Sequence, residues 1–218
     1  MEIKKVGYRG VLFTFTNPSS CPLNVYAIQG SQYCYVIDTG LGSLNALPIK
    51  EYMEESGKRI IVINTHHHFD HIWGNSTFQN NLIISHALCR EMIASQWEDM
   101  MRDYRHRCLG KVQMKLPDLV FTGELHFAED GLRLFHSPGH TMDSISVLDE
   151  KDRILIVADN IGESMTQIIP SLSCEKNMYR STLEKYLTLD FDFCVSGHNK
   201  ILNKQSIGDI LAIMDTET

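Results

Sequence analysis

A short histidine-rich segment holds the side chains of this sequence that are best suited to chemistry. It contains His66, His68, Asp70 and His71. His66 and His68 are two positions apart, so in an extended chain both imidazoles point to the same side, whereas Asp70 and His71 follow after the chain turns. Imidazole and carboxylate groups are ligands for zinc, iron(II) and manganese(II). The segment predicts a metal site, and the simpler alternative is a solvated loop or a fortuitous metal scavenger.

Three later residues share the placement of this segment, directly after a predicted strand. His140 follows the apolar run that ends at Phe135, Asp159 follows residues 154–158, and His198 follows residues 193–195. Each residue alone could simply cap a turn or fill a loop. Together with the first segment they supply five histidines and two aspartates, which is enough to hold two metal ions.

The elements that must position these residues follow an α/β pattern. Residues 59–64, just before the histidine-rich segment, have the length and branched apolar composition of a buried strand. Strands are also predicted within residues 10–38, 82–85, 125–135, 145–158 and 193–195, and helices over residues 48–56, 87–107, 175–189 and 204–215. We therefore expect one domain, residues 1–218, with two sheets packed together, helices outside, and two halves meeting near residues 108–117.

Composition narrows the class of protein. The 218 residues are 43% apolar and 22% charged, as in ordinary soluble globular proteins. There is no signal-peptide core and no apolar run of the ~20 residues needed to cross a bilayer. The six cysteines form no CxxC pair, which favours reduced thiols in a cytoplasmic protein. A formal charge of −7 makes nucleic acid an unlikely partner. The expected partner is a small-molecule substrate. The oligomeric state cannot be read from the sequence.

On these motifs the sequence resembles the metallo-β-lactamase-fold hydrolase superfamily. The signature His-x-His-x-Asp-His is matched by residues 66–71, and Gly-His-Thr by residues 139–141. The strand-end Asp159, the terminal Gly-His of residues 197–198 and the early Asp-Thr-Gly of residues 38–40 match as well. The resemblance covers nearly the whole chain and implies a four-layer αββα sandwich with the metals at one edge.

The resemblance also implies a role for each ligand. The first metal would be held by His66, His68 and His140, the second by Asp70, His71 and His198, and Asp159 would bridge the two. Asp70 is expected to be catalytic as well, because it would orient the nucleophile. The ions would be zinc, with iron(II) or manganese(II) as alternatives, since the ligands alone do not fix the metal.

The expected function is therefore a metal-dependent hydrolase. Two divalent ions would bind a bridging water and lower its pKa from ~15.7 to near 7, giving a hydroxide that attacks a small ester, thioester or lactone. A phosphodiesterase with the same metals is the alternative enzyme, and a non-catalytic metal-binding protein of the same fold is the alternative from another class. The substrate itself cannot be read from the sequence.

Several other residues receive simpler interpretations. Asp38 and Thr141 are candidates for fixing the orientation of an imidazole. His67 has the wrong parity for the ligand face, and we expect no metal at the isolated residues His86, His106, His126 and His136. The basic stretch near the middle of the chain is interpreted as a solvated helix face rather than an anion site. It comprises Arg102, Arg105, Arg107, Lys111 and Lys115.

Overall fold

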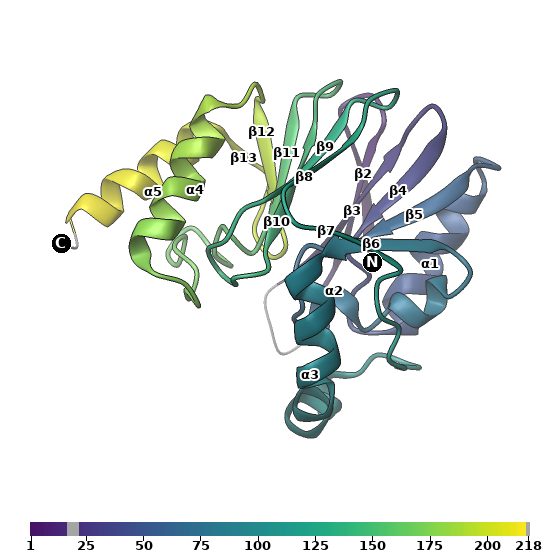
Figure 1. Ribbon diagram of the computed structural model, residues 1–218. Helices are drawn as coiled ribbons and strands as arrows, with labels where there is room; N and C mark the ends of the chain where they lie inside the picture. Colours follow the sequence, from purple (N-terminus) through teal and green to yellow (C-terminus); the bar gives the residue numbers. More distant parts are fainter. Residues whose placement is uncertain (17–21, 217–218) are drawn as a thin grey trace.

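The structure is a computed structural model that describes residues 1–16 and 22–216. Its strands form two sheets that pack face to face (Figure 1). In the first sheet the strands lie in sequence order: β1 (Glu2–Val6), β2 (Gly10–Phe15), β3 (Leu23–Gln29), β4 (Tyr33–Ile37), β5 (Arg59–Ile63), β6 (Leu82–His86) and β7 (Leu119–Phe121). Strands β1 to β4 pair antiparallel, and β4 to β7 pair parallel.

The second sheet has the order β13-β12-β11-β10-β9-β8. Its strands are β8 (Glu124–Phe127), β9 (Leu132–His136), β10 (Ile145–Asp149), β11 (Ile154–Ala158), β12 (Phe193–Ser196) and β13 (Leu202–Asn203). Only β11 and β12 pair in parallel within this sheet, so their carboxyl ends lie at the same edge.

Helices complete the four layers. The helix α1 (Ser43–Glu54) covers the outer face of the first sheet, and α4 (Lys176–Thr188) and α5 (Gln205–Thr216) cover the outer face of the second sheet (Figure 1). The short α2 (Phe69–Ile72) and the long α3 (Ala87–Tyr104) pack around Trp73 and Trp97 in a separate cluster. Two 3-10 segments, η1 (Asn75–Phe78) and η2 (Arg105–Arg107), follow α2 and α3. The layers confirm the expected αββα sandwich.

The buried strands alternate between two cores. In β4, Tyr35 and Ile37 face the second sheet, whereas Cys34 and Val36 face α1. Successive side chains of a strand point to opposite faces, so a strand covered on both sides must be apolar at every position. This explains why these strands appear in the sequence as continuous apolar runs rather than as alternating ones.

The structure differs from the expected elements in several places. The first helix begins at Ser43 rather than Pro48, which lies inside α1 and removes one backbone hydrogen bond without ending the helix. The side chain of Asn45 accepts a hydrogen bond from Leu41 N (2.9 Å) and so closes the turn that starts the helix earlier. The first sheet also extends past residues 108–117, because the unpredicted strand β7 pairs with β6.

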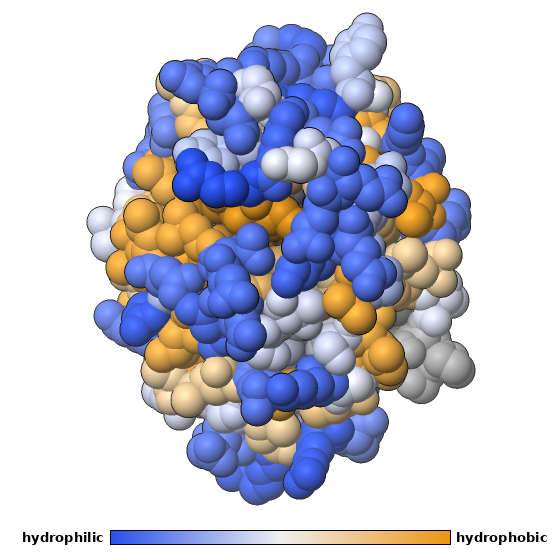
Figure 2. All heavy atoms as spheres, turned by 90° about the vertical axis from the view of Figure 1, so that its right-hand side faces the viewer, coloured by the Kyte–Doolittle hydropathy of each residue, from blue (hydrophilic) through white to orange (hydrophobic). Residues whose placement is uncertain are grey.

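The surface of the described structure is largely polar on the face that carries α1 (Figure 2), and its cysteines are reduced. The face that carries α1 is mostly hydrophilic, with apolar side chains in patches between polar ones (Figure 2). Within the described ranges, every cysteine is a free thiol; Cys34, Cys89 and Cys194 are buried, and Cys108 and Cys174 are half-buried. Cys21 lies outside the described residues. No helix of the described part of the chain is long and apolar enough to cross a membrane.

Backbone hydrogen bonds tie the strand ends of both sheets into one rim. Asp38 N, just after β4, donates to Ile63 O at the end of β5 (2.8 Å). Across the two sheets, Ile145 N at the start of β10 donates to Thr65 O (2.9 Å). Polar residues that follow unrelated strands are therefore held at one edge of the sandwich.

Candidate metal centre

At this rim the structure brings together all seven histidine and aspartate residues singled out in the sequence. Their ligand-type atoms form three groups, each within 4.8 Å: His66 with His68 and His140, His66 with His71 and Asp159, and Asp70 with His71 and His198. They come from the loop after β5, the start of α2, and the segments after β9, β11 and β12. The two expected ligand triads thus exist as compact groups, and the role of each residue remains a prediction.

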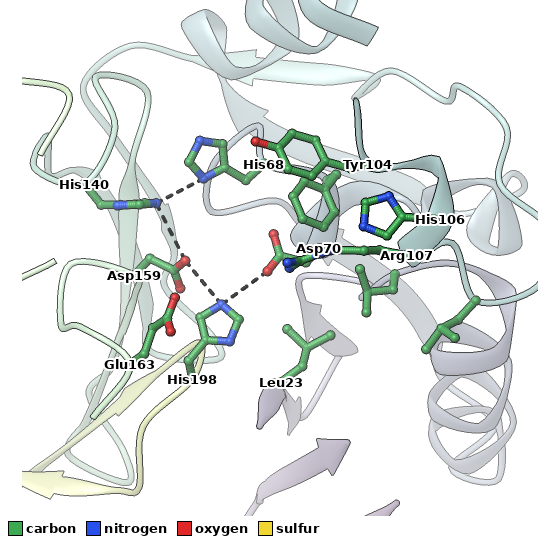
Figure 3. Close-up of a pocket in the computed structure, with 13 residues that line it drawn as sticks. Leu23, His68, Asp70, Tyr104, His106, Arg107, His140, Asp159, Glu163 and His198 are labelled. Carbon is green, nitrogen blue, oxygen red and sulfur yellow. Dashed lines mark hydrogen bonds and ion pairs between the residues drawn. The ribbon is translucent and has the colours of Figure 1, made fainter. Parts of the chain in front are cut away.

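Asp159 lies at the middle of the cluster. Its Oδ2 atom is 3.3 Å from His71 Nε2, 3.4 Å from His198 Nε2, 3.7 Å from His140 Nε2 and 3.8 Å from His66 Nε2. Figure 3 shows His140 and His198 on either side of this carboxylate. One oxygen therefore faces both triads, which is the position expected of a bridging ligand.

The remaining contacts close the two ends of the cluster. His68 Nδ1 and His140 Nε2 are 3.0 Å apart at one end. At the other end, Asp70 Oδ2 is 3.3 Å from His198 Nε2 (Figure 3). Asp70 Oδ1 is 3.9 Å from His71 Nε2. Lone-pair atoms from all of these side chains converge on one small volume.

Outward-facing nitrogens hold the imidazoles in place. His71 Nδ1 donates to Asp38 Oδ2 (2.8 Å), His140 Nδ1 to Ser171 O (2.8 Å), and His198 Nδ1 to Pro22 O (2.9 Å). Donation from Nδ1 leaves the Nε2 lone pair for the interior of the cluster, an arrangement typical of metal-ligating histidines. The carbonyls of Ser171 and Pro22 were not foreseen in the sequence, because a backbone acceptor has no residue-type signal.

Thr65 links a second imidazole to the same carboxylate. Its hydroxyl donates to Asp38 Oδ2 (2.7 Å) and lies 3.1 Å from His66 Nδ1. The expectation for Asp38 is therefore confirmed in geometry. The expectation for Thr141 has no such support, because its hydroxyl lies 2.7 Å from Ser144 Oγ, within its own loop.

Local backbone strain helps to aim two of these side chains. Asp38 has φ 66° and Ala158, just before Asp159, has φ 47°, in the left-handed region that non-glycine residues rarely adopt. Such conformations cost about 1–3 kcal/mol each and concentrate at functional sites. Here they turn the chain sharply at the ends of β4 and β11, so that both carboxylates point into the rim.

Buried atoms without hydrogen-bond partners show that the cluster fits a cation. His66 Nε2, His71 Nε2 and Asp159 Oδ1 are buried and have no such partner. Buried polar atoms in proteins are nearly always satisfied, so a group of unsatisfied ones needs an explanation. Nitrogen and carboxylate lone pairs aimed at one point are what a divalent metal requires.

The protonation states favour the same conclusion. Burial, with His71 nearby, lowers the pKa of His66 well below its usual value, and burial with His140 nearby lowers the pKa of His68 to about 4. These two imidazoles are neutral at pH 7, and neutral imidazole is the form that binds metal.

The pKa shifts of Asp159 and His71, unlike those of His66 and His68, favour the charged form of each side chain. Burial would raise the pKa of Asp159, but His71 and His198 outweigh it and hold that pKa well below its usual value. Burial would likewise lower the pKa of His71, yet Asp159, Asp38 and Asp70 raise it well above 6.5. The ionised carboxylates thus favour a positive charge at this point, which a bound cation would supply.

Other histidines have contacts outside the cluster. His67 Nδ1 lies 2.9 Å from Asp143 Oδ1, and both side chains are buried. His86 accepts a hydrogen bond from Leu88 N at the start of α3 and stacks on His136, with ring centroids 4.2 Å apart. These positions agree with structural roles.

A cavity of about 460 Å³ opens over the cluster. Five of the seven cluster residues reach its wall: His68, Asp70, His140, Asp159 and His198 (Figure 3). The remaining lining residues are Leu23, Leu41, Phe69, Tyr104, His106, Arg107, Leu109 and Glu163. The interpretation of the basic stretch as a solvated helix face is therefore incomplete, because Arg107 lines this cavity.

Comparison with known proteins identifies the class. Residues 20–198 match the profile of the Metallo-beta-lactamase superfamily. Two solved structures share the fold: the DIM-1 metallo-beta-lactamase (TM-score 0.79, 15% identity, 100% of this chain and 97% of that chain) and a metallo-beta-lactamase from Hirschia baltica (TM-score 0.79, 16% identity, 97% and 96%). The chain belongs to the metallo-beta-lactamase superfamily.

Similar curated proteins include hydrolases. The chain is 26% identical to the acyl-coenzyme A thioesterase MBLAC2 of Gallus gallus over 208 residues, covering 78% of this chain and 72% of that protein. It is 29% identical to the Bos taurus protein of the same name over 163 residues, but spans only 57% of its length. A hydroxyacylglutathione hydrolase of Maricaulis maris is 33% identical over 99 residues, 45% of this chain and 32% of that protein. Within its superfamily, this chain is a metal-dependent hydrolase.

Proposed function

We propose that this chain is a dinuclear metal hydrolase that cleaves a small ester, thioester or lactone. The observation that carries the proposal is the central position of Asp159 Oδ2, within 3.8 Å of the Nε2 atoms of four histidines. One metal would be held by His66, His68 and His140 and the other by Asp70, His71 and His198, the triads that lie on either side of Asp159.

Zinc is the metal we propose for both positions. The donor set is imidazole nitrogen and carboxylate oxygen, which zinc accepts at either triad. The neutral state of His66 and His68 and the ionised state of Asp159 support metal binding near neutral pH. Iron(II) and manganese(II) accept the same donors, so metal analysis of the purified protein decides among them.

When bound, two such ions would activate water as a nucleophile near pH 7 and polarise the substrate carbonyl. The chain's own residues would position this water. Asp70 borders the cavity, and its pKa is lowered because His71 and His198 outweigh the effect of burial. As an ionised carboxylate, Asp70 would orient the attacking water by accepting a hydrogen bond at Oδ1 or Oδ2.

Among the three candidate bonds, the thioester has the most support. The chicken and bovine relatives are named acyl-coenzyme A thioesterases, and the relative from Maricaulis maris is named for a glutathione thioester. A thiolate is also a good leaving group, so the reaction makes little demand for a strong general acid. A small-molecule thioester is therefore our proposed substrate class.

A substrate panel with metal analysis tests the proposal. The zinc-loaded protein is assayed with an acyl thioester, a lactone and bis(4-nitrophenyl) phosphate, and bound metal is counted per chain. We expect two zinc ions and fastest turnover of the thioester. Faster cleavage of the phosphodiester would make the protein a phosphodiesterase, and full metal occupancy with no turnover would indicate a non-catalytic binding role.

A further inference from the structure

The cavity over the cluster has a second charged feature, Arg107 at the end of η2. We infer that Arg107 forms an anion-binding subsite that receives a phosphate or carboxylate group on the thiol part of the substrate. The inference deepens the proposed thioesterase function and rests on it. It assigns a binding role to one member of a basic stretch that the sequence alone presents as solvated.

An aromatic stack fixes the place of this guanidinium. The Cζ atom of Arg107 lies 5.9 Å from the centroid of the Phe69 ring. That ring stacks on Tyr104 (4.5 Å between centroids, 15° between planes) and packs against the fully buried Trp73 (4.9 Å). Because Phe69 lies between His68 and Asp70 in the chain, its contact with Arg107 places this guanidinium beside the histidine and aspartate cluster (Figure 3).

The charge of Arg107 is available to a ligand. Within the residues that the structure describes, no carboxylate lies within ion-pairing distance of its guanidinium. Arg102, five residues earlier, is by contrast held by Asp99 (2.5 Å) and Asp103 (2.8 Å). The two arginines therefore differ in their ion pairing: carboxylates neutralise Arg102, and no described carboxylate does the same for Arg107.

Two opposite walls of the cavity carry side chains of opposite charge. Glu163 lies near Asp159 and His198 on one side, whereas Arg107 lies on the opposite side (Figure 3). A substrate anion is repelled by Glu163 and attracted by Arg107, so it is directed to the Arg107 side. The reacting carbonyl then lies over the cluster, between the two walls.

The chemistry of the subsite defines the class of group it takes. A guanidinium presents paired N–H donors that match two oxygens of a carboxylate or phosphate. The exposed residue His106 lines the same cavity and offers a further polar side chain. A volume of about 460 Å³ is within the range of small-molecule sites, so the carbonyl and a distant anionic group fit together.

Matched thioesters and matched arginine variants test the inference. The same acyl group is presented on coenzyme A, which carries phosphates, on glutathione, which carries carboxylates, and on N-acetylcysteamine, which carries neither. For Arg107→Ala we expect kcat/KM to fall about tenfold or more on the preferred anionic thioester, chiefly through KM, with little change on N-acetylcysteamine. Arg107→Lys should recover part of the loss. Arg105→Ala, from the same 3-10 segment but outside the cavity lining, is the control and should behave like the wild type.

A binding measurement separates this inference from the proposed function. Free coenzyme A, glutathione and N-acetylcysteamine are titrated into each protein by calorimetry, with no reaction required. Weaker binding of an anionic thiol to Arg107→Ala but not to Arg105→Ala supports the subsite, and the preferred thiol distinguishes phosphate from carboxylate. Equal binding by the two variants, or equal losses on N-acetylcysteamine, overturns it. If the wild type cleaves no thioester, the proposed function fails, while the titrations still decide the role of Arg107.

Discussion

The carboxylate of Asp38 contacts the imidazole of His71 at 2.8 Å, on the side of the ring that faces away from the cluster. The same carboxylate accepts hydrogen bonds from the backbone N–H (2.8 Å) and the hydroxyl (2.7 Å) of Thr65. One buried side chain at the end of β4 thus links the loop after β5 to the start of α2. The ligand geometry depends on a residue that is not itself one of the proposed metal ligands.

The first prediction concerns this link. In Asp38→Asn the side chain keeps its size but loses the charge that holds His71, so we expect roughly 10–100-fold weaker metal affinity. Competition with a chromogenic chelator measures the affinity. Asp152→Asn is the control, because Asp152 also accepts backbone N–H groups, from Tyr8 and Arg9, but lies at the opposite end of β11 from Asp159. Wild-type affinity in Asp38→Asn would show that His71 needs no such support.

The second prediction concerns the central carboxylate. In Asp159→Ala the proposed shared ligand is removed, so one of two metal ions should be lost. Hydrolysis should fall more than about 100-fold, since changing even a residue that only positions a ligand costs roughly 10–100-fold. Elemental analysis and initial rates provide the two readouts. His86→Ala, outside the cluster, should leave both nearly intact, and equal effects from the two variants would refute the ligand assignment.

The third prediction concerns pH and a carboxylate outside the proposed metal site, that of Asp130. Burial would raise the pKa of Asp130, but hydrogen bonds from Ser31 and Tyr35 outweigh it and lower the pKa. The Tyr35 hydroxyl donates at 2.8 Å and the Ser31 hydroxyl at 2.7 Å. A lowered folded-state pKa gives stability that is present above the unfolded-state value of ~3.9 and is lost as the pH falls through the folded-state value.

Asp130→Asn should therefore be about 1–3 kcal/mol less stable than the wild type at pH 7. The difference should narrow below about pH 4, where this carboxyl takes up a proton in the unfolded chain before it does so in the folded protein. Urea unfolding at pH 7 and at pH 3.5 measures both differences. A gap that is the same at both pH values would show that the charge of Asp130 contributes nothing.

The positions of the cluster residues could be predicted because strand ends leave a signal in the sequence. Asp159 and His198 each follow an apolar run, and the two runs become the parallel strands β11 and β12, whose ends must lie together. His140 follows an antiparallel strand, yet the same principle applies, since a polar residue leaving the sheet has to lie at its edge. The sandwich itself follows from strands that are apolar on both faces.

Other parts of the site have no comparable signal. The carbonyls of Ser171 and Pro22 support two imidazoles, but any residue type supplies a carbonyl. Arg105 and Arg107 look alike in the sequence, and only the end of α3 and the turn of η2 decide which one lines the cavity. Tertiary placement, rather than residue type, determines these contacts.

The last prediction concerns the tight packing at Gly197, just before His198. A Cβ atom at this position would lie 2.2 Å from Asp159 Oδ1 and 2.9 Å from His71 Cε1. Both distances are shorter than the contacts that Cβ atoms make in proteins. Gly197→Ala should therefore displace these two side chains and reduce both metal content and hydrolysis strongly. Gly123→Ala is the matched control, because a Cβ there meets no atom within 4 Å and should change neither. Circular dichroism shows whether each variant keeps its fold. Full activity in folded Gly197→Ala would mean that the cluster tolerates a shift of Asp159, which is incompatible with a ligand shared between two closely spaced ions.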